Sequence, residues 1–243
     1  LELLEAMCEE KQSGVRDLSQ KVGLNRSTVN RLVATLERAG YVEQERERGK
    51  YRATLKLFEL GNQVLHHLDI REEAYPIMQK LAEETEETIN LAILDGGQVV
   101  YILKIDSPHL LKSSAPVGSH PPIHCNASGK VILAYLPEDK QKLVLPTVLT
   151  PFTPNTIVST KDLEVELASI RDKGYAVDNE EWSLNTSAVA APIWNNNGKI
   201  MAALTIAGPS VRITPQRVDE LIPTIQAAAG ELSFKLGYRG QTK

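Results

Sequence analysis

The segment over residues 15–36 constrains the fold of this chain more than any other, because it has the pattern of two short helices joined by a tight turn. Leu18 and Val22 lie four residues apart, as on one face of a helix, and Gly23 follows where a helix commonly ends. A second helix is predicted over residues 26–39. Two helices joined by a turn that contains glycine are typical of a helix-turn-helix.

The second of these helices divides its side chains between an apolar face and a polar face. Its apolar residues recur at helical spacing and predict a buried face of Val29, Leu32, Val33 and Leu36. The polar residues of its first turns include no acid, and they are Arg26, Ser27, Thr28, Asn30 and Arg31. In such motifs this end of the helix enters the major groove, where Arg pairs with guanine, Asn with adenine, and hydroxyls with phosphates or base edges. We therefore predict a DNA-reading helix; the alternative is a solvated charged helix on another small helical domain.

A two-stranded hairpin is predicted directly after this helix, over residues 41–53 with its turn at Gly49. The basic residues of the hairpin are Arg46, Arg48, Lys50 and Arg52. They alternate with acidic residues and with Tyr51, an arrangement that allows one basic face, while the turn leaves the register open. We predict that Lys50 contacts DNA phosphate, whatever the base sequence.

The distribution of charge favours nucleic-acid binding by the front of the chain more than the net charge does. The whole chain has a formal charge of −4, but residues 1–54 hold ten Lys and Arg against nine Asp and Glu, and so carry about +1. Lys21, Arg26 and Arg31 fall within residues 18–36, which contain no acid. A local cationic surface allows an otherwise acidic protein to bind DNA.

The composition also bears on where the protein works. No stretch of about 20 apolar residues that could span a membrane is present in the sequence, and no signal peptide is visible. The two cysteines, Cys8 and Cys125, do not make a disulfide framework and fit the reducing cytoplasm. Because the chain opens on Leu1 in a helical pattern without Met, we interpret its start as trimmed.

From residue 54 onward the pattern predicts a long helix and then a mixed domain. Residues 54–69 carry an apolar stripe and are expected to link two domains; the stripe is Leu57, Leu60, Val64 and Leu68. Residues 70–87 continue as a helix with an interruption at Pro76. Strands are predicted over residues 88–94, 98–105, 175–179, 188–194 and 199–207, and helices over residues 127–136, 160–173 and 214–236. The hairpin signal at residues 95–97 indicates an antiparallel sheet, so the predicted fold class is α+β.

Four blocks of sequence resemble one family of known proteins. Residues 23–42, GLNRSTVNRLVATLERAGYV, strongly resemble the DNA-binding signature of the IclR family of bacterial regulators. The other blocks follow in the family's order: residues 118–130 ending in ASGK, DNEE (178–181) with AAPI (190–193), and AGP (207–209) with Arg212. The resemblance implies a winged helix-turn-helix at residues 1–53, a linker helix at 54–69 and a GAF-like effector-binding domain at 70–243. It also implies a dimer or a dimer of dimers.

The same resemblance places a small-molecule pocket in the second domain. The residues that would bind the effector are Ser128, Gly129, Asp178, Thr186, Ala188, Thr205 and Ala207. Ser128 and Gly129 begin a predicted helix, whose free N–H groups and dipole favour an anion. Family effectors are often small organic acids or aromatic compounds, which suit such a helix end.

This sequence departs from the family at several pocket positions. The family often has Gly and Cys where Asn185 and Ala188 stand here, and two serines where Thr205 and Ala207 stand. We therefore expect the location of the pocket to be kept better than its chemistry. Structural roles are also open, because Asp178 can be a turn or capping residue and Ser128 can cap the helix. Glu180 and Glu181 are expected to be a solvated charge pair.

A metal or catalytic site at His120, His124 and Cys125 is the remaining alternative within the sequence. The spacing of the two histidines would suit a helix, but Pro121 and Pro122 exclude a regular helix there. No phosphate loop, dinucleotide fingerprint or nucleophile elbow is present in the sequence. We therefore expect no metal, no cofactor and no catalysis.

These patterns together predict a ligand-responsive transcription regulator of a bacterial catabolic or metabolic operon, acting in the cytoplasm without a membrane partner. Each subunit is expected to bind half of a pseudo-palindromic operator in double-stranded DNA, as part of a dimer or tetramer. The helix over residues 54–69 would transmit the effector signal. The alternative is a small-molecule enzyme or metabolite-binding module whose front helices contact protein; turnover of a ligand without DNA retention would favour it.

Overall fold

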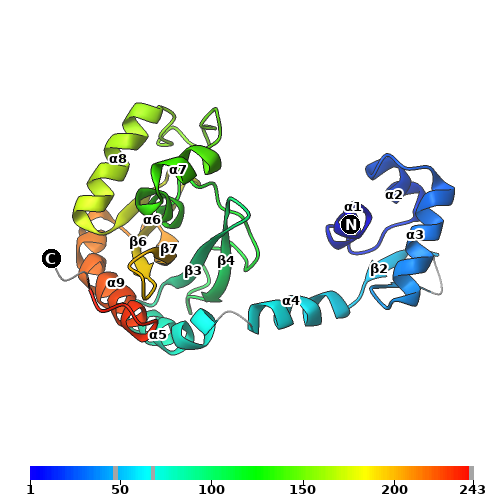
Figure 1. Cartoon of the computed structure of the whole chain (residues 1–243), viewed down its shortest axis with the longest axis horizontal. Helices are drawn as coiled ribbons and strands as arrows, with labels where there is room; N and C mark the ends of the chain where they lie inside the picture. The colour runs from blue at the N-terminus through cyan, green and yellow to red at the C-terminus, as the bar shows by residue number, and fades with distance from the viewer. Residues whose placement is uncertain (46–48, 67–68, 241–243) are drawn as a thin grey trace. The chain divides into compact units, whose positions relative to one another are not determined.

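The computed structural model describes residues 1–45, 49–66 and 69–240, and it divides into two compact units, residues 1–68 and 69–243 (Figure 1). Three residues named above, Arg46, Arg48 and Leu68, lie outside the described residues, as does the side chain of Val64. Within the described ranges, no helix is long and apolar enough to cross a membrane.

The first unit is a small helical bundle followed by a two-stranded sheet. Its elements are α1 (Glu2–Cys8), α2 (Val15–Lys21), α3 (Arg26–Arg38), β1 (Val42–Gln44), β2 (Tyr51–Ala53) and α4 (Lys56–His66). β1 and β2 pair antiparallel, with Val42 opposite Ala53 and Gln44 opposite Tyr51. The core of this unit is formed by Leu3, Ala6, Met7, Leu18, Val29, Val33 and Val42. The predicted winged helix-turn-helix is confirmed.

Two local features fix where α3 begins. Gly23, in the turn after α2, has a φ of +66°, a conformation that costs a residue with a side chain but not glycine. Asn25 is the N-cap of α3, and its Oδ1 accepts a hydrogen bond of 2.9 Å from the Thr28 N–H. The cap satisfies an N–H group that the helix itself cannot pair.

The buried face of α3 is narrower than the sequence predicted. Val29 and Val33 are fully buried and Leu36 is half-buried, but Leu32 is 38% exposed. The residues at spacing i, i+4 and i+7 face the core of the unit, and Leu32, at i+3, lies at the edge of that stripe. The prediction that Leu32 belongs to the buried face was therefore wrong.

The second unit is built on a five-stranded antiparallel sheet in the order β4–β3–β7–β6–β5. The strands are β3 (Thr88–Asp95), β4 (Gln98–Ile105), β5 (Ala176–Asn179), β6 (Thr186–Trp194) and β7 (Ile200–Pro209). Gly96 and Gly97, both with positive φ, make the turn of the predicted β3–β4 hairpin. The antiparallel sheet and the α+β class are confirmed.

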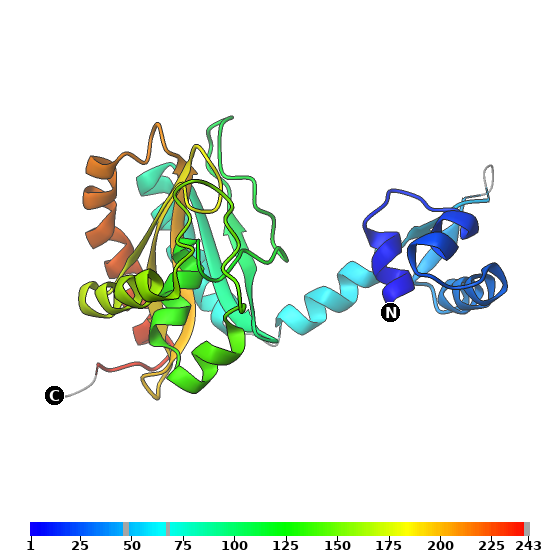
Figure 2. The ribbon, with the colours of Figure 1, turned by 90° about the horizontal axis from the view of Figure 1, so that it is seen from above.

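Helices cover both faces of this sheet (Figures 1 and 2). α5 (Asp69–Thr85) and α9 (Pro215–Lys235) pack together on one face, while α6 (Ala127–Tyr135) packs on the other face beside α8 (Thr160–Lys173). The short α7 (Glu138–Val144) follows α6. The sheet face toward α6 is rich in small side chains, which are Ala92, Ala188, Ala190, Ala203 and Ala207. Small residues on this face let a helix approach the sheet closely.

Pro76 does not interrupt α5, contrary to the prediction. It lies inside the helix, which continues from Asp69 to Thr85. Pro76 and Glu72 are both on the exposed side of α5, so water can reach the Glu72 carbonyl that the proline leaves unpaired. Ile77, Met78 and the other buried residues of α5 hold the helix to the core on its opposite side.

The helix predicted over residues 54–69 begins at Lys56 in the structure, and residues 67 and 68 of that range lie outside the described residues. α4 ends at His66 and α5 begins at Asp69. Leu57 of the predicted stripe is half-buried and Leu60 is exposed. α7 was not predicted from the sequence; it is a seven-residue helix in which no residue is buried, so it lacks the apolar periodicity that marks longer helices.

Candidate DNA-binding surface and effector site

The N-terminal half of α3 presents the predicted DNA-reading residues on the surface of the first unit. Arg26, Ser27, Asn30 and Arg31 are exposed, and Thr28 is half-buried. The Ser27 Oγ donates a hydrogen bond of 2.7 Å to the Asn25 side chain, so its proton is engaged in the cap while its oxygen remains an acceptor. Among the described residues, neither Arg26 nor Arg31 takes part in an ion pair.

The other basic residues near this surface are partly neutralised. Arg52 lies opposite Glu43 in the hairpin, and their side chains form an ion pair of 2.7 Å. Lys21 lies 2.6 Å from Glu9, so it adds little to the cationic surface. Lys50 is half-buried next to β2. Because its charge is paired with Glu43, Arg52 does not contribute to the basic face that the sequence allowed for the hairpin.

In the second unit, strand register brings most of the predicted effector residues onto the sheet face toward α6. Asp178 on β5 lies opposite Ala188 on β6, which lies opposite Ala207 on β7. Thr205 is two residues from Ala207 on the same face, since side chains alternate along a strand. Thr186 is half-buried at the start of β6, opposite Pro209. These residues are far apart in sequence, and only the fold brings them together.

Ser128 connects α6 directly to this face. Its Oγ lies 2.7 Å from the Thr205 Oγ1, and both side chains are buried. Tyr101 on β4 is also buried here, and burial raises the pKa of its phenol to about 12, with a hydrogen bond to Ser128 acting in the opposite direction. Hydroxyls from α6, β7 and β4 thus meet in the interior of the second unit.

Gly129 has a packing role at the start of α6. Any side chain at this position would collide with the backbone of Ile123, so the close approach of the preceding loop requires glycine. The Gly129 N–H donates a 2.9 Å hydrogen bond to Asn126, which is the N-cap of the helix. The prediction that Gly129 offers a free N–H to an anion was therefore wrong, and the capping role considered for Ser128 belongs to Asn126.

Asp178 is buried beside the same face. Its Oδ1 accepts a 2.8 Å hydrogen bond from the Glu181 N–H, the turn role that the sequence allowed. Burial raises the pKa of its carboxyl to about 7, and the hydrogen bond from Glu181 partly opposes that rise. Asp178 can therefore change its protonation state near neutral pH within the candidate effector site.

A buried ion-pair network lies next to Asp178. The Lys130 Nζ contacts Glu181 at 2.6 Å, Glu166 at 2.9 Å and the Val177 carbonyl at 2.6 Å. Glu181 is buried, so its expected place in a solvated pair with Glu180 was wrong; Glu180 itself is half-buried and accepts a hydrogen bond from Ser210. Because Lys130 has three donors and three acceptors around it, its charge is fully engaged.

Four interior polar residues on or beside this face were not predicted from the sequence, and they are Asn90, Tyr101, Asn126 and Lys130. Asn90 on β3 lies opposite Thr205 on β7 and is buried. A single polar residue within an apolar strand or helix, such as Asn90 between Ile89 and Leu91, is the sequence signal that could have identified them.

In the segment with the two histidines, His124 and Cys125 are both buried. The His124 Nε2 lies 3.1 Å from the Thr150 carbonyl, and burial lowers the pKa of its imidazole. Cys125 is a buried free thiol, and burial raises its pKa to about 12. Within the described part of the chain, no three His, Cys, Asp or Glu side chains are grouped to hold a metal ion.

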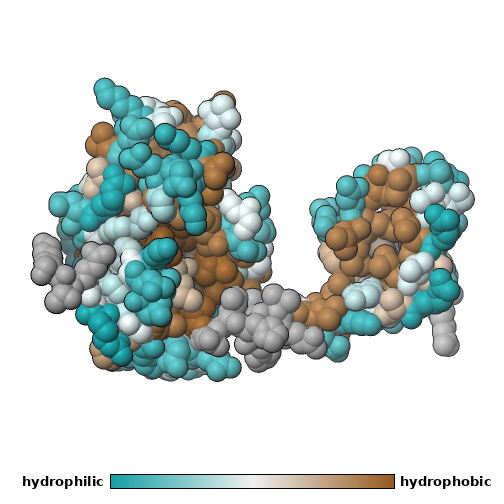
Figure 3. Space-filling model, in the orientation of Figure 1, coloured by the Kyte–Doolittle hydropathy of each residue, from teal (hydrophilic) through white to brown (hydrophobic). Residues whose placement is uncertain are grey.

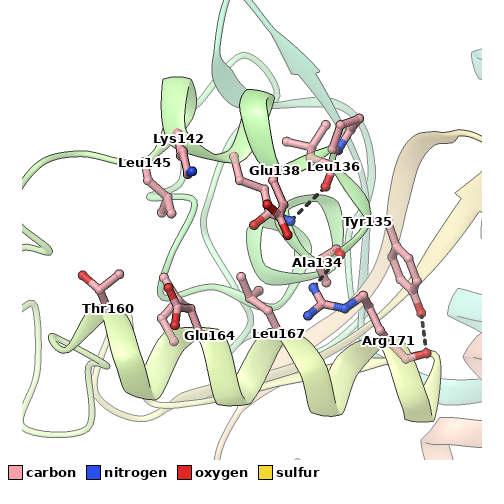
Figure 4. Close-up of a pocket in the computed structure, with 13 residues that line it drawn as sticks. Ala134, Tyr135, Leu136, Glu138, Lys142, Leu145, Thr160, Glu164, Leu167 and Arg171 are labelled. Carbon is pink, nitrogen blue, oxygen red and sulfur yellow. Dashed lines mark hydrogen bonds between the residues drawn. The ribbon is translucent and has the colours of Figure 1, made fainter.

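A separate surface groove of about 980 Å³ lies between the end of α6, α7 and α8 (Figure 4). Its lining mixes apolar and charged side chains, and Arg171 crosses it to donate a 3.0 Å hydrogen bond to the Ala134 carbonyl. None of the predicted effector residues lines this groove. The groove depends on α7 and could not have been predicted from the sequence.

A helix-turn-helix unit joined to an α+β unit with an interior polar site defines a class of proteins, the regulators that bind DNA with one domain and a small ligand with the other. The chain matches the family model of the IclR helix-turn-helix domain over residues 1–46 and that of the bacterial transcriptional regulator IclR C-terminal domain over residues 62–234. The chain belongs to the IclR family of bacterial transcriptional regulators.

Individual relatives agree with this assignment. The chain is 38% identical to the HTH-type transcriptional regulator KdgR of Escherichia coli (strain K12), over 97% of this chain and 90% of that protein. The crystal structure of Thermotoga maritima IclR matches with a TM-score of 0.82 and 33% identity, over 98% of this chain and 96% of that one. An IclR homologue of Microbacterium hydrocarbonoxydans, solved in complex with 4-hydroxybenzoate, shares the fold with a TM-score of 0.85 at 23% identity, over 96% of each chain.

Proposed function

We propose that this regulator binds a pseudo-palindromic operator as a dimer or tetramer and responds to a small organic acid or aromatic effector. It acts in the bacterial cytoplasm on a catabolic or metabolic operon, and its role is regulatory rather than catalytic. The observation that carries the DNA-binding part is the exposed first half of α3, where Asn30 is exposed and where Arg26 and Arg31 form no ion pair with another described residue. Arg and Asn are the side chains that read guanine and adenine edges.

Assembly is supported by the apolar surface of the first unit. Figure 3 shows apolar side chains exposed on the visible face of each unit. Around the start of α4, Leu55 is 77% exposed and Phe58 is 66% exposed. Large apolar side chains exposed together are typical of a surface that a partner covers. A second copy of the chain is the partner we propose, because two subunits supply the two half-sites of a palindrome.

The effector site that we propose is the face shared by Ser128, Asp178, Thr205, Ala188 and Ala207, with Thr186 at its rim. Ligand sites usually combine mainly apolar walls with a few well-placed polar groups, and this face has both. Ser128 and Thr205 are both buried and bond to each other. An effector must therefore take over that hydrogen bond, which moves α6 relative to the sheet. Such a ligand regulates DNA binding only if it prefers one arrangement of the subunits to the other.

The experiment that tests this function is selection of fragments from the source genome by the purified full-length protein, followed by footprinting. A discrete pseudo-palindromic site is the expected result, and the genes beside it would indicate the class of effector. No preferred site at modest salt, either alone or with cell metabolites added, would refute the proposal and favour the metabolite-binding alternative.

A further inference from the structure

Asn90 stands out among the polar residues of the sheet face toward α6. It lies on β3 directly opposite Thr205, and only 1% of its surface is exposed. Paired residues of neighbouring antiparallel strands project from the same face of the sheet, so Asn90 and Thr205 are neighbours on the face that Ser128 contacts. We propose that Asn90 contacts the effector and selects ligands that carry a hydroxyl group; this deepens the proposed function and rests on it.

The Asn90 Oδ1 is a buried acceptor without a hydrogen-bond partner among the described residues. Buried polar atoms in folded proteins are almost always paired, because an unpaired one loses its hydration and gains nothing in return. An unpaired acceptor in the interior therefore lowers the stability of the folded protein. At a ligand site such an acceptor is explained, because the bound ligand donates the missing hydrogen bond.

Other polar side chains on the same face have partners within the protein. Thr88, two residues before Asn90, accepts a hydrogen bond from the Ser107 N–H, and Thr205 is bonded to Ser128. Asp178 accepts a hydrogen bond from Glu181. Their hydrogen bonds stabilise the fold whether or not a ligand is present. The unpaired Oδ1 separates Asn90 from Thr88, Thr205 and Asp178. Glu181, beside this face, also has one unpaired oxygen, but its other oxygen is bonded to Lys130.

The chemistry around Asn90 fits a hydroxyl. A hydroxyl donates one hydrogen bond and accepts others. It can donate to the Asn90 Oδ1 while it accepts from the Thr205 or Ser128 hydroxyl, whose mutual bond the ligand disrupts. A carboxylate or a carbonyl has no proton to donate to Oδ1 and cannot satisfy it. Asn90 therefore discriminates between a hydroxylated acid and the same acid without its hydroxyl group.

The test compares wild type with Asn90→Leu, whose side chain has the same branched shape and number of heavy atoms but no polar atom. The control is Thr88→Val on the same strand face, which removes a hydroxyl that has a partner. Without ligand, Asn90→Leu should raise the Tm, by about 2–4 °C if about 1 kcal/mol of unpaired-acceptor cost is removed. Thr88→Val should lower it. A lower Tm for Asn90→Leu would mean that Asn90 stabilises the fold and would overturn the proposal.

Ligand binding is measured on the same full-length proteins with matched pairs of probes, 4-hydroxybenzoate against benzoate and glycerate against propionate. At least one hydroxylated probe should bind wild type and its unhydroxylated partner more weakly, and Asn90→Leu should lose about tenfold in affinity for the hydroxylated probe alone. Asn90→Ala, which leaves space rather than filling it, repeats the measurement if Asn90→Leu fails to fold.

Three binding results would overturn the proposal: no binding by any hydroxylated probe, unchanged affinity in the variants, or an equal loss for both members of a pair. DNA retention by the wild type is measured in parallel with a selected operator fragment. Failure to retain DNA would count against the proposed regulatory function, whereas the probe affinities report on Asn90 independently.

Discussion

At the scale of single residues, the interior of the second unit contains polar and titratable side chains whose burial reduces the stability of the fold. Asp178 is the clearest titratable case, because burial raises the pKa of its carboxyl to about 7. The ordinary pKa of an aspartate in an unfolded chain is about 3.9. The folded state therefore binds the proton more tightly than the unfolded state, and the stability of the protein falls as pH rises from about 4 to about 7.

Asp178→Asn should remove this pH dependence. Asn keeps an oxygen that can accept the Glu181 N–H and cannot ionise. The stability of the variant relative to wild type should grow by about 3 kcal/mol between pH 5 and pH 8, as measured by urea denaturation. Asp172→Asn, at an exposed position on α8, is the control and should show no such growth. An equal stability difference at both pH values would contradict the raised pKa of Asp178.

The sequence could indicate only some of the interior residues. Asp178, Thr205 and Ser128 were found through a family resemblance, and their side chains do meet on one face or beside it. Asn90 and Glu181 were not, because their importance depends on strand register and on the ion pair with Lys130, which link residues far apart in the chain. A local pattern can show that a residue is polar but not which distant side chain it faces.

At the scale of elements, α3 and α6 each depend on a side-chain cap and on glycine. Asn25 caps α3 and Asn126 caps α6. The sequence predicted the long helices and the strands because their apolar periodicity is strong. It failed at Pro76, where packing overrides the local preference, and at α7, which buries no side chain and so leaves no pattern.

Arg31→Ala tests α3 as the DNA-reading element. The substitution should weaken binding to the selected operator by about 1–3 kcal/mol, because a bidentate pair to a base is lost. Arg38→Ala, in the last turn of the same helix, is the matched control and should have a much smaller effect. The measurement is a fluorescence titration with a labelled operator. Equal effects of the two substitutions would show that α3 contributes charge rather than base recognition.

Gly129→Ala tests the close contact between α6 and the loop before it. The added methyl group meets the Ile123 backbone, and we expect a loss of about 1–3 kcal/mol in unfolding free energy. Gly230→Ala, inside α9 with open space around it, should instead stabilise the protein by up to about 1 kcal/mol. The unfolding free energies of both variants are measured by chemical denaturation. An unchanged value for Gly129→Ala would show that the loop at Ile123 can move away from the added methyl group.

At the scale of the whole molecule, charge is distributed unevenly. The chain has a net charge of −4, yet residues 1–54 are slightly cationic. DNA binding by such a protein depends on a few local cations and should fall steeply with salt, because bound counterions are released from the DNA. The acidic remainder limits binding to other anionic surfaces.

Lys50→Ala should reveal one of these cations. We expect weaker binding to operator and to unrelated DNA alike, with the slope of log affinity against log salt reduced by about one. Lys161→Ala, on the exposed surface of α8 in the second unit, should leave the slope unchanged. A loss confined to one operator base would mean that Lys50 reads sequence instead.

The attachment of α6 at both ends has a mechanical consequence. At one end Ser128 is bonded to Thr205 on the sheet; at the other, Arg171 and Tyr135 join the end of α6 to α8. A nine-residue helix with a rise of about 1.5 Å per residue behaves as a stiff rod about 13 Å long. Displacing the rod at Ser128 by one ångström therefore displaces Ala134 by a similar distance. If an effector fills the proposed interior site, we therefore expect the wall of the groove in Figure 4 to move, so that the outer surface changes shape with the occupancy of the interior.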